Sequence, residues 1–313
     1  MLMGPTGAGK TDAALAFVER FPLEIVSVDS ALVFRQMDIG TAKPPPEVLA
    51  SVPHHLVDIL DPSERYSAGR FVTDAQAAIA DIRARGRVPL LVGGTMLYFR
   101  AMQSGLAALP AADPALRQRI DARGTAEGWP ALHAELARLD PPAAARIRPN
   151  DRQRIQRALE VIAITGQPIS ARQREDLRGS VAEGALRLVL APASRADLAG
   201  RIERRFHRMM ELGLLEETRR LHARGDLDES LPSIRCVGYR QLWAHLEGRC
   251  ALPEAVERGI VATRQLAKRQ LTWLRSEAGA EWFDALDSGV GARMSGRIGE
   301  WLAGWAGGDP GVR

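Results

Sequence analysis

Cysteine, lysine and long apolar runs are all scarce in this chain of 313 residues. Two cysteines, Cys236 and Cys250, cannot form a framework of disulfides, and without a CxxC pair a zinc ribbon is not expected. No apolar run approaches the roughly 18–20 residues of a membrane span, and the first residues lack the basic and apolar regions of a secretory signal. We therefore expect a cytoplasmic enzyme with no membrane partner.

The positive charge is carried almost entirely by arginine. Lysine plus arginine number 42 against 38 acidic residues, giving a formal net charge of +4. That excess permits the binding of a polyanion without requiring it. The lysines are only Lys10, Lys43 and Lys268. In a chain so rich in arginine and alanine, each remaining lysine marks a position to examine for a role that arginine does not fill.

Short apolar runs alternate with amphipathic stretches in the first third of the chain. Residues 24–28 and 88–92 have the pattern of buried strands, and residues 68–85 between them have helical periodicity. Residues 185–191 again have strand character. The order strand, helix, strand is typical of a parallel α/β sheet, so we expect an α/β core of the P-loop NTPase-like kind.

Only helical signals follow residue 109, up to about residue 177. Asp113 and Pro114 suit the cap and first position of one helix, and Asn150-Asp151 begin another. We therefore expect an inserted all-helical domain at 110–184 between two parts of the core, 1–109 and 185–306, and a flexible tail at 307–313. The second part should be helix-rich, with helices near 195–224, 234–247 and 253–275.

The motif G-x-x-x-x-G-K-[ST] occurs near the start of the chain, and its residues are Gly4, Pro5, Thr6, Gly7, Ala8, Gly9, Lys10 and Thr11. In such a loop, backbone N–H groups curl around phosphate oxygens, the lysine adds a positive charge, and the Thr11 hydroxyl can ligate Mg²⁺. The motif is also typical of ATP-binding proteins, so it does not name the reaction. The strand before it has only three residues. Either that strand is short or the true start lies upstream.

Polar residues follow the other predicted strands at the edge where ligands bind in such sheets. Asp29 there could act as a general base or hold Mg²⁺ through water. Gly93-Gly94-Thr95 follows the next strand, and Lys43 lies in a polar loop that could face an anion. Two basic helices add to this set. One carries Arg201 and Arg205 on one face, and the other has a basic stripe near Trp273 that suits phosphate backbone contacts.

With these residues assembled, the chain closely resembles the bacterial tRNA dimethylallyltransferase (tRNA isopentenyltransferase) family. The resemblance covers most of residues 1–280. The matching segments are GPTGAGKT (4–11), IVSVDSAL (25–32), MDIGTAKP (37–44), YSAGRF (66–71), LVGGTMLYF (91–99), PNDRQRIQRALEV (149–161), RCVGYRQLW (235–243) and ATRQLAKRQLTWLR (262–275). Their order and spacing together make the resemblance specific.

The resemblance implies a prenyl transfer to tRNA. The family moves a dimethylallyl group from dimethylallyl diphosphate to N6 of the adenosine 3′-adjacent to the anticodon, in tRNAs that read codons beginning with U. By resemblance, Asp29 is the general base, and Thr11 and Arg205 stabilise the diphosphate that leaves. Magnesium is the implied cofactor, with Thr11 as its ligand beside the diphosphate. The helical insertion is expected to clasp the anticodon stem-loop, and a monomer is expected.

The resemblance also implies direct contacts with tRNA. The residues concerned are Asp29, Ser30, Ala31 and Leu32; Thr95; Arg117; Gln153, Arg154, Ile155, Gln156 and Arg157; Arg235, Cys236, Val237, Gly238, Tyr239 and Arg240; and Lys268, Arg269, Gln270, Leu271, Thr272, Trp273, Leu274 and Arg275.

Other functions remain open on the residues alone. An adenylate isopentenyltransferase that acts on free nucleotide shares the loop and the carboxylate, but needs neither the helical insertion nor the basic stripe. A P-loop kinase of small molecules, or a nucleic-acid-binding NTPase module, would also use the loop. Incubation with dimethylallyl diphosphate and unmodified tRNA, followed by mass mapping, separates these possibilities.

Overall fold

A computed structural model of the chain describes residues 1–105, 109–175 and 184–306, so the predicted tail at 307–313 lies outside the described residues. The chain forms two compact units. One contains Met1–Phe99 and the chain from Gly184 onward, and the other is Arg100–Glu183. The insertion predicted at 110–184 and the second unit end within one residue of each other, but the second unit begins ten residues earlier, at Arg100. Across the described part of the chain, no helix combines the length and apolar character that crossing a membrane requires.

A parallel sheet forms the centre of the first unit, and its described strands run in the order β3-β2-β4-β1-β5-β6. These strands are β1 (Leu2–Met3), β2 (Leu23–Val28), β3 (His54–His55), β4 (Val88–Gly93), β5 (Leu188–Ala191) and β6 (Glu281–Asp284). The predicted α/β class is confirmed. Because all pairs are parallel, the carboxyl ends of the strands lie at one edge, and the segments that follow them meet there.

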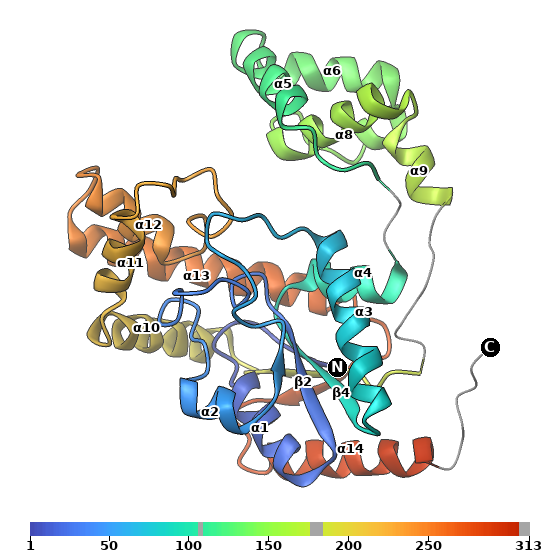
Figure 1. The fold of residues 1–313 in the computed structure, drawn as a ribbon, viewed down its shortest axis with the longest axis vertical. Helices are drawn as coiled ribbons and strands as arrows, with labels where there is room; N and C mark the ends of the chain where they lie inside the picture. Colours follow the sequence, from blue (N-terminus) through green and yellow to red (C-terminus); the bar gives the residue numbers. More distant parts are fainter. Residues whose placement is uncertain (106–108, 176–183, 307–313) are drawn as a thin grey trace. The chain divides into compact units, whose positions relative to one another are not determined.

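Helices cover both faces of this sheet (Figure 1). They are α1 (Lys10–Arg20), α2 (Pro46–Ser51), α3 (Ala68–Ala84), α4 (Met96–Ser104), which begins in this unit, α10 (Arg195–Glu211), α11 (Leu214–His222), α12 (Tyr239–Leu246), α13 (Leu252–Leu274) and α14 (Val290–Ala306). Phe17 of α1 and Met294 of α14 share one buried cluster with alternate residues of β2, β4 and β5. Helix α3 packs against β2 and β4 as well, but its buried Phe71 and Ile79 are not part of that cluster.

The structure corrects several predicted boundaries. The helix expected over 195–224 is two helices, because Gly213 adopts a left-handed φ of 100° between α10 and α11. The helix expected from 234 begins at Tyr239, and the strand expected from 185 begins at Leu188. Neither β6 nor α14 is expected from the sequence.

The second unit consists of helices among its described residues. They are α5 (Pro114–Ala126), α6 (Trp129–Leu139), α7 (Pro141–Ala144), α8 (Arg152–Thr165) and α9 (Ile169–Glu175). Both predicted helix starts are confirmed, because the Asp113 side chain accepts from the Leu116 amide and that of Asp151 from the Arg154 amide. Leu132, Leu136 and neighbouring apolar residues of α5, α7 and α8 form a core of its own for this unit.

Candidate active site

The phosphate-binding loop connects β1 to α1 and has the backbone form that an anion site needs. A Cβ atom on Gly4 would lie 2.2 Å from the Leu190 carbonyl oxygen of β5, so only glycine allows this close approach. Gly7 and Gly9 have left-handed φ angles of 79° and 92°, which side chains disfavour. The loop therefore turns tightly, and its backbone N–H groups lie beside the N-terminus of α1, where an anion can accept hydrogen bonds from them.

Two long helices hold this loop from outside. The Arg201 Nε of α10 donates a hydrogen bond to the Gly7 carbonyl at 2.8 Å. The side chain of Gln270 on α13 accepts from the Thr6 amide at 2.9 Å and donates to the Gly94 carbonyl at 2.8 Å. Gln270 thus ties the loop after β1 to the loop after β4. No local sequence pattern predicts either contact, because the partners are far apart in the chain.

Positive charge is concentrated beside the loop. The Lys10 ammonium donates to the Pro5 carbonyl at 2.8 Å, and burial lowers the pKa of Lys10 to about 8, against the opposing effect of Asp29. Burial also lowers the pKa of Arg205, and the carboxylates of Asp29 and Asp12 counteract that shift. Since the same carboxylate acts on both cations, Lys10, Arg205 and Asp29 share one electrostatic environment.

Asp29 lies directly after β2, next to the loop that follows β4. Its Oδ1 accepts from the Ala31 amide at 2.9 Å, and the Thr95 hydroxyl oxygen accepts from the Ser30 amide at 3.0 Å. The structure therefore brings the predicted Asp29, Ser30 and Thr95 together at the sheet edge. Leu32 follows in the same turn, where its carbonyl accepts from the Asp58 amide.

Tyr98, to which the sequence assigns no separate role, lies close enough to Asp29 for the carboxylate charge to act on it. Its ring stacks on Phe71, with 4.2 Å between ring centroids, and it packs edge-on against Tyr66. Burial, and then the charge of Asp29, raise the pKa of Tyr98. The same two causes raise the pKa of Cys236 to about 12. Both side chains are therefore neutral neighbours of the carboxylate at physiological pH.

The segment 235–240 divides into exposed and buried residues. Arg235 and Arg240 are exposed, and Val237 is half-buried. Tyr239 is 0% exposed, and its hydroxyl donates to the Glu217 carboxylate at 2.6 Å. Gly238 has a φ of 97° and is buried against Phe206 and Leu214. Tyr239 and Gly238 thus form part of the core, whereas the side chains of Arg235 and Arg240 are accessible to a ligand.

Helix α13 shows the same division. Lys268, Arg269, Thr272 and Arg275 are exposed, whereas Leu271 and Leu274 are buried. Trp273 is half-buried.

Lys43 does not face an anion site, which corrects the expectation from its rarity. Its side chain is 2% exposed, and its ammonium contacts Asp38 at 2.6 Å and also Asp58. It donates to the Phe34 carbonyl at 2.9 Å as well. Two carboxylates and a carbonyl therefore bind the Lys43 ammonium, which connects the two ends of the segment 34–58.

In the second unit, a buried carboxylate organises the predicted tRNA contacts. Glu160 is 0% exposed and pairs with Arg117 through two hydrogen bonds of 2.9 and 3.0 Å. Arg157 pairs with it at 2.5 Å. Burial opposes ionisation of Glu160, but the two arginines and the Asp113 amide lower its pKa overall. Both guanidinium groups are thus held in place, with part of each side chain exposed.

The remaining residues of that segment lie on different faces of α8. Gln153 and Arg154 are exposed, and Gln156 donates to the Arg117 carbonyl at 3.5 Å. Ile155 is 0% exposed and belongs to the core of the unit. A direct contact of the Ile155 side chain with RNA would need that core to open.

Comparison with known proteins gives a consistent result. Residues 32–277 match the family model described as IPP transferase. The tRNA dimethylallyltransferase of Methylococcus capsulatus is 57% identical over 295 residues, covering 94% of this chain and 95% of that protein. That of Thioalkalivibrio sulfidiphilus is 60% identical over 280 residues, covering 90% and 88%.

Solved structures agree. The tRNA isopentenylpyrophosphate transferase of Bacillus halodurans matches with a TM-score of 0.68 at 38% identity, covering 97% of this chain and 94% of that one. A eukaryotic dimethylallyltransferase described as acting on tRNA matches with a TM-score of 0.81 at 25% identity, covering 97% and 79%.

Proposed function

Because the chain belongs to the IPP transferase family, we infer that it transfers a dimethylallyl group to an adenosine of tRNA. We also propose that dimethylallyl diphosphate is the donor of this group. The acceptor would be N6 of the adenosine 3′-adjacent to the anticodon, in tRNAs that read codons beginning with U. Action on free adenylate and a kinase activity are not favoured, since the similar proteins are named for tRNA.

The loop suits a diphosphate leaving group. Transfer forms a bond between N6 and the allylic carbon and breaks the bond from that carbon to the diphosphate oxygen. The departing diphosphate gains negative charge, which the loop N–H groups, Lys10 and Arg205 would stabilise. These donors are already fixed, since Arg201 and Gln270 hold the loop, so little reorganisation is needed during the reaction.

Asp29 suits the role of general base. The N6 lone pair is delocalised into the adenine ring, so the amine is a weak nucleophile and benefits when a carboxylate accepts its proton. Asp29 is fixed by its position after β2 and by the Ala31 amide. A base inside a tRNA loop must leave its stack to reach such a site.

The residues also fit a magnesium ion held together with the diphosphate. The Thr11 side chain is exposed at the start of α1, and its hydroxyl makes no hydrogen bond with any described residue. Mg²⁺ usually retains several waters and binds through one or two protein oxygens plus substrate phosphates. Bound there, it would neutralise diphosphate charge. A cytoplasmic, monomeric enzyme is part of the same proposal.

The single observation that carries the mechanism is the shared environment of Asp29, Lys10 and Arg205. We expect Asp29→Asn to lower kcat by about 10²–10⁴-fold, the usual contribution of a general base. The affinities for tRNA and dimethylallyl diphosphate should change little, because the amide keeps the shape of the carboxylate. Single-turnover kinetics with mass mapping of the tRNA product, together with separate binding assays, measure both quantities.

Magnesium titration provides the control. If Asp29 were chiefly a metal ligand, the Asn variant would bind diphosphate more weakly, and excess Mg²⁺ would restore part of the rate. Such a rescue would contradict the general-base assignment. A flat response to Mg²⁺ at low kcat supports it.

A further inference from the structure

A cavity of about 220 Å³ lies at the carboxyl ends of β5 and β6, next in the sheet to the strand that leads into the phosphate-binding loop. Its lining residues are Ala191, Pro192, Ala193, Arg195, Leu271, Arg275, Trp282, Phe283 and Asp284. None of them has a part in the diphosphate chemistry above, and only Leu271 and Arg275 belong to the segments expected to contact tRNA. All belong to the first unit.

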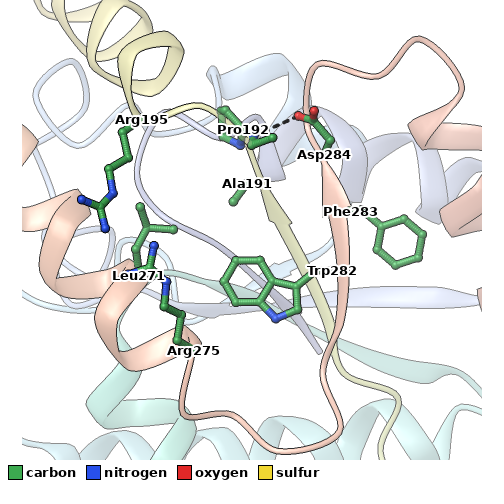
Figure 2. A pocket seen from close by; sticks show the side chains of 9 residues that line it. Ala191, Pro192, Arg195, Leu271, Arg275, Trp282, Phe283 and Asp284 are labelled. Atoms are coloured by element: carbon green, nitrogen blue, oxygen red, sulfur yellow. Dashed lines mark hydrogen bonds between the residues drawn. The ribbon is translucent and has the colours of Figure 1, made fainter.

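Two arginines that have no side-chain partner among the described residues line this cavity. Arg195 is the first residue of α10, and Arg275 follows α13. Among the side chains and backbone groups that the structure describes, none forms a hydrogen bond or ion pair with either guanidinium group, whereas Arg264 of α13 pairs with Glu203. Figure 2 shows both side chains on the same side of the cavity. Two neighbouring cations repel each other, and a bound anion would offset that repulsion.

An exposed aromatic ring forms another wall. Trp282 is 46% exposed, although it lies in a strand of the sheet. Successive strand residues point to opposite faces, and Phe283 packs against the buried cluster under the sheet. In Figure 2 the Trp282 ring points toward Leu271 and Arg275, and the Phe283 ring points away. A flat indole face beside cationic groups is the usual platform for stacking a nucleic acid base.

A carboxylate completes the lining and narrows the choice of ligand. Asp284 Oδ1 accepts from the amides of Ala193 and Leu286 at 3.2 and 3.0 Å. Its Oδ2 has no partner among the described residues. A carboxylate repels inorganic phosphate but accepts hydrogen bonds from ribose hydroxyls or an amino group. An aromatic face, two cations and one acceptor therefore suit a nucleotide better than a simple anion.

We propose that this cavity is a nucleotide site, in which a base stacks on Trp282 and a phosphate lies between Arg195 and Arg275. Asp284 accepts from the sugar or from an amino group of the base. The nucleotide has two possible sources, a free mononucleotide or one nucleotide of the bound tRNA. The cavity lies at β5 and β6, whereas Asp29 follows β2 in another part of the sheet. The proposal goes beyond the transfer reaction, and its tRNA source rests on the proposed function.

Calorimetric titration of the full chain with AMP tests the first source. We expect AMP to bind and inorganic phosphate to bind at least about tenfold more weakly, because phosphate cannot stack. Trp282→Leu keeps apolar bulk but removes the aromatic face, so AMP affinity should fall about tenfold, while Trp282→Phe should retain most of it. Arg195→Ala should also weaken binding. Arg258→Ala, which removes an exposed arginine of α13 that pairs with Glu254, is the matched control and should not.

The second source is tested by binding of a tRNA transcript to the same variants. If AMP does not bind but Trp282→Leu weakens tRNA binding about fivefold or more, the nucleotide comes from the tRNA. The proposal is overturned if Trp282→Leu changes neither affinity. It is also overturned if AMP binding is lost in Lys10→Ala and kept in Trp282→Leu, because AMP would then occupy the phosphate-binding loop.

These readouts do not depend on product formation. A chain that binds AMP through Trp282 but does not prenylate tRNA would support the nucleotide site and contradict the proposed function. If the protein prenylates tRNA but Trp282→Leu changes the affinity for neither AMP nor tRNA, the proposed function is supported and the nucleotide site is contradicted.

Discussion

Burial determines how the single charge on Lys10 responds to pH. With its pKa lowered to about 8, the ammonium of the ligand-free protein is close to losing its proton under mildly alkaline conditions. A bound diphosphate favours the charged form. Binding should therefore take up a proton above pH 8, and the affinity for diphosphate should decrease as pH rises through that region.

We expect the difference in diphosphate affinity between wild type and Lys10→Arg to grow by up to about tenfold per pH unit above pH 8. Arginine stays charged throughout, and the ionisation of diphosphate itself affects both proteins equally. Calorimetry with inorganic diphosphate from pH 6.5 to pH 9.5 measures this difference. Parallel affinity curves for the two proteins would contradict the assignment of a titrating Lys10.

The lowered pKa of Lys10 weakens diphosphate binding as pH rises, but over the same pH range it increases the stability of the ligand-free protein. The folded pKa of Lys10, about 8, lies below the ordinary value of 10.5, so the unfolded chain binds more protons between these limits. The contribution of Lys10 to the free energy of unfolding therefore increases as pH rises from 8 to 10.5.

Residue identity alone predicts the position of some of these side chains and misjudges that of others. A loop motif and a strand end fix the backbone around Lys10 and Asp29, and the two lie close enough for the Asp29 charge to act on Lys10; their roles in the reaction stay predictions. Lys43 was singled out for its rarity, but two nearby carboxylates bind it. Cys236 and Tyr98 reach the surroundings of Asp29 only through tertiary packing, which no local pattern in the sequence reports.

At the scale of elements, helix α11 positions a loop of the core through one buried carboxylate. Glu217 is 2% exposed and accepts from the amides of Asp38, Ile39 and Gly40 at 2.9–3.1 Å. Tyr239 at the start of α12 adds a fourth donor. The carboxylate thereby connects α11, α12 and the loop over residues 38–40, and this makes the segment 235–240 a rigid support for its exposed arginines.

We expect Glu217→Ala to lower the free energy of unfolding by at least about 2 kcal/mol, because it leaves four donors without their acceptor. Tyr239→Phe removes only one of the four hydrogen bonds and should cost about 1 kcal/mol. Urea unfolding of the full chain measures both. Equal losses for the two variants would show that the backbone amides gain little from the carboxylate.

Element prediction succeeded where periodicity and caps were strong and failed where tertiary contacts decide. Helices α5 and α8 began at their predicted caps, Asp113 and Asp151. Strand β6 was missed because Glu281 and Trp282 are polar or exposed, as suits an edge strand whose outer positions face solvent. The single helix predicted over 195–224 failed at Gly213, whose left-handed conformation the periodicity did not report.

At the scale of the whole molecule, basic residues for tRNA contact occur in both units. The first unit exposes Arg235, Arg240, Lys268 and Arg269, and the second holds Arg117 and Arg157 on Glu160. The family membership and the transferase activity inferred from sequence motifs are confirmed by the relatives. The individual contacts with tRNA stay predictions.

We expect Lys268→Ala to weaken tRNA binding uniformly across tRNA sequences and to reduce the slope of log K against log salt by about 1, if Lys268 meets a phosphate. Fluorescence titrations at several salt concentrations measure this slope. Arg258→Ala, which removes a charge already paired with Glu254, should leave the slope nearly unchanged. An unaltered slope and affinity for Lys268→Ala would remove this lysine from the interface.

The central position of β1 has a consequence for the order in which the protein is made. Leu2 pairs with Val92 of β4 on one side and with Leu188 of β5 on the other, so during synthesis β1 and β4 wait for β5. Residues 94–187 lie between those partners, and at about 5–20 residues per second their synthesis takes roughly 5–20 s. During that time the nascent chain carries an open sheet edge beside an incomplete phosphate-binding loop, while the inserted unit can already bury its own core. The nascent enzyme is therefore most prone to aggregation just before β5 emerges, when the open edge has existed longest.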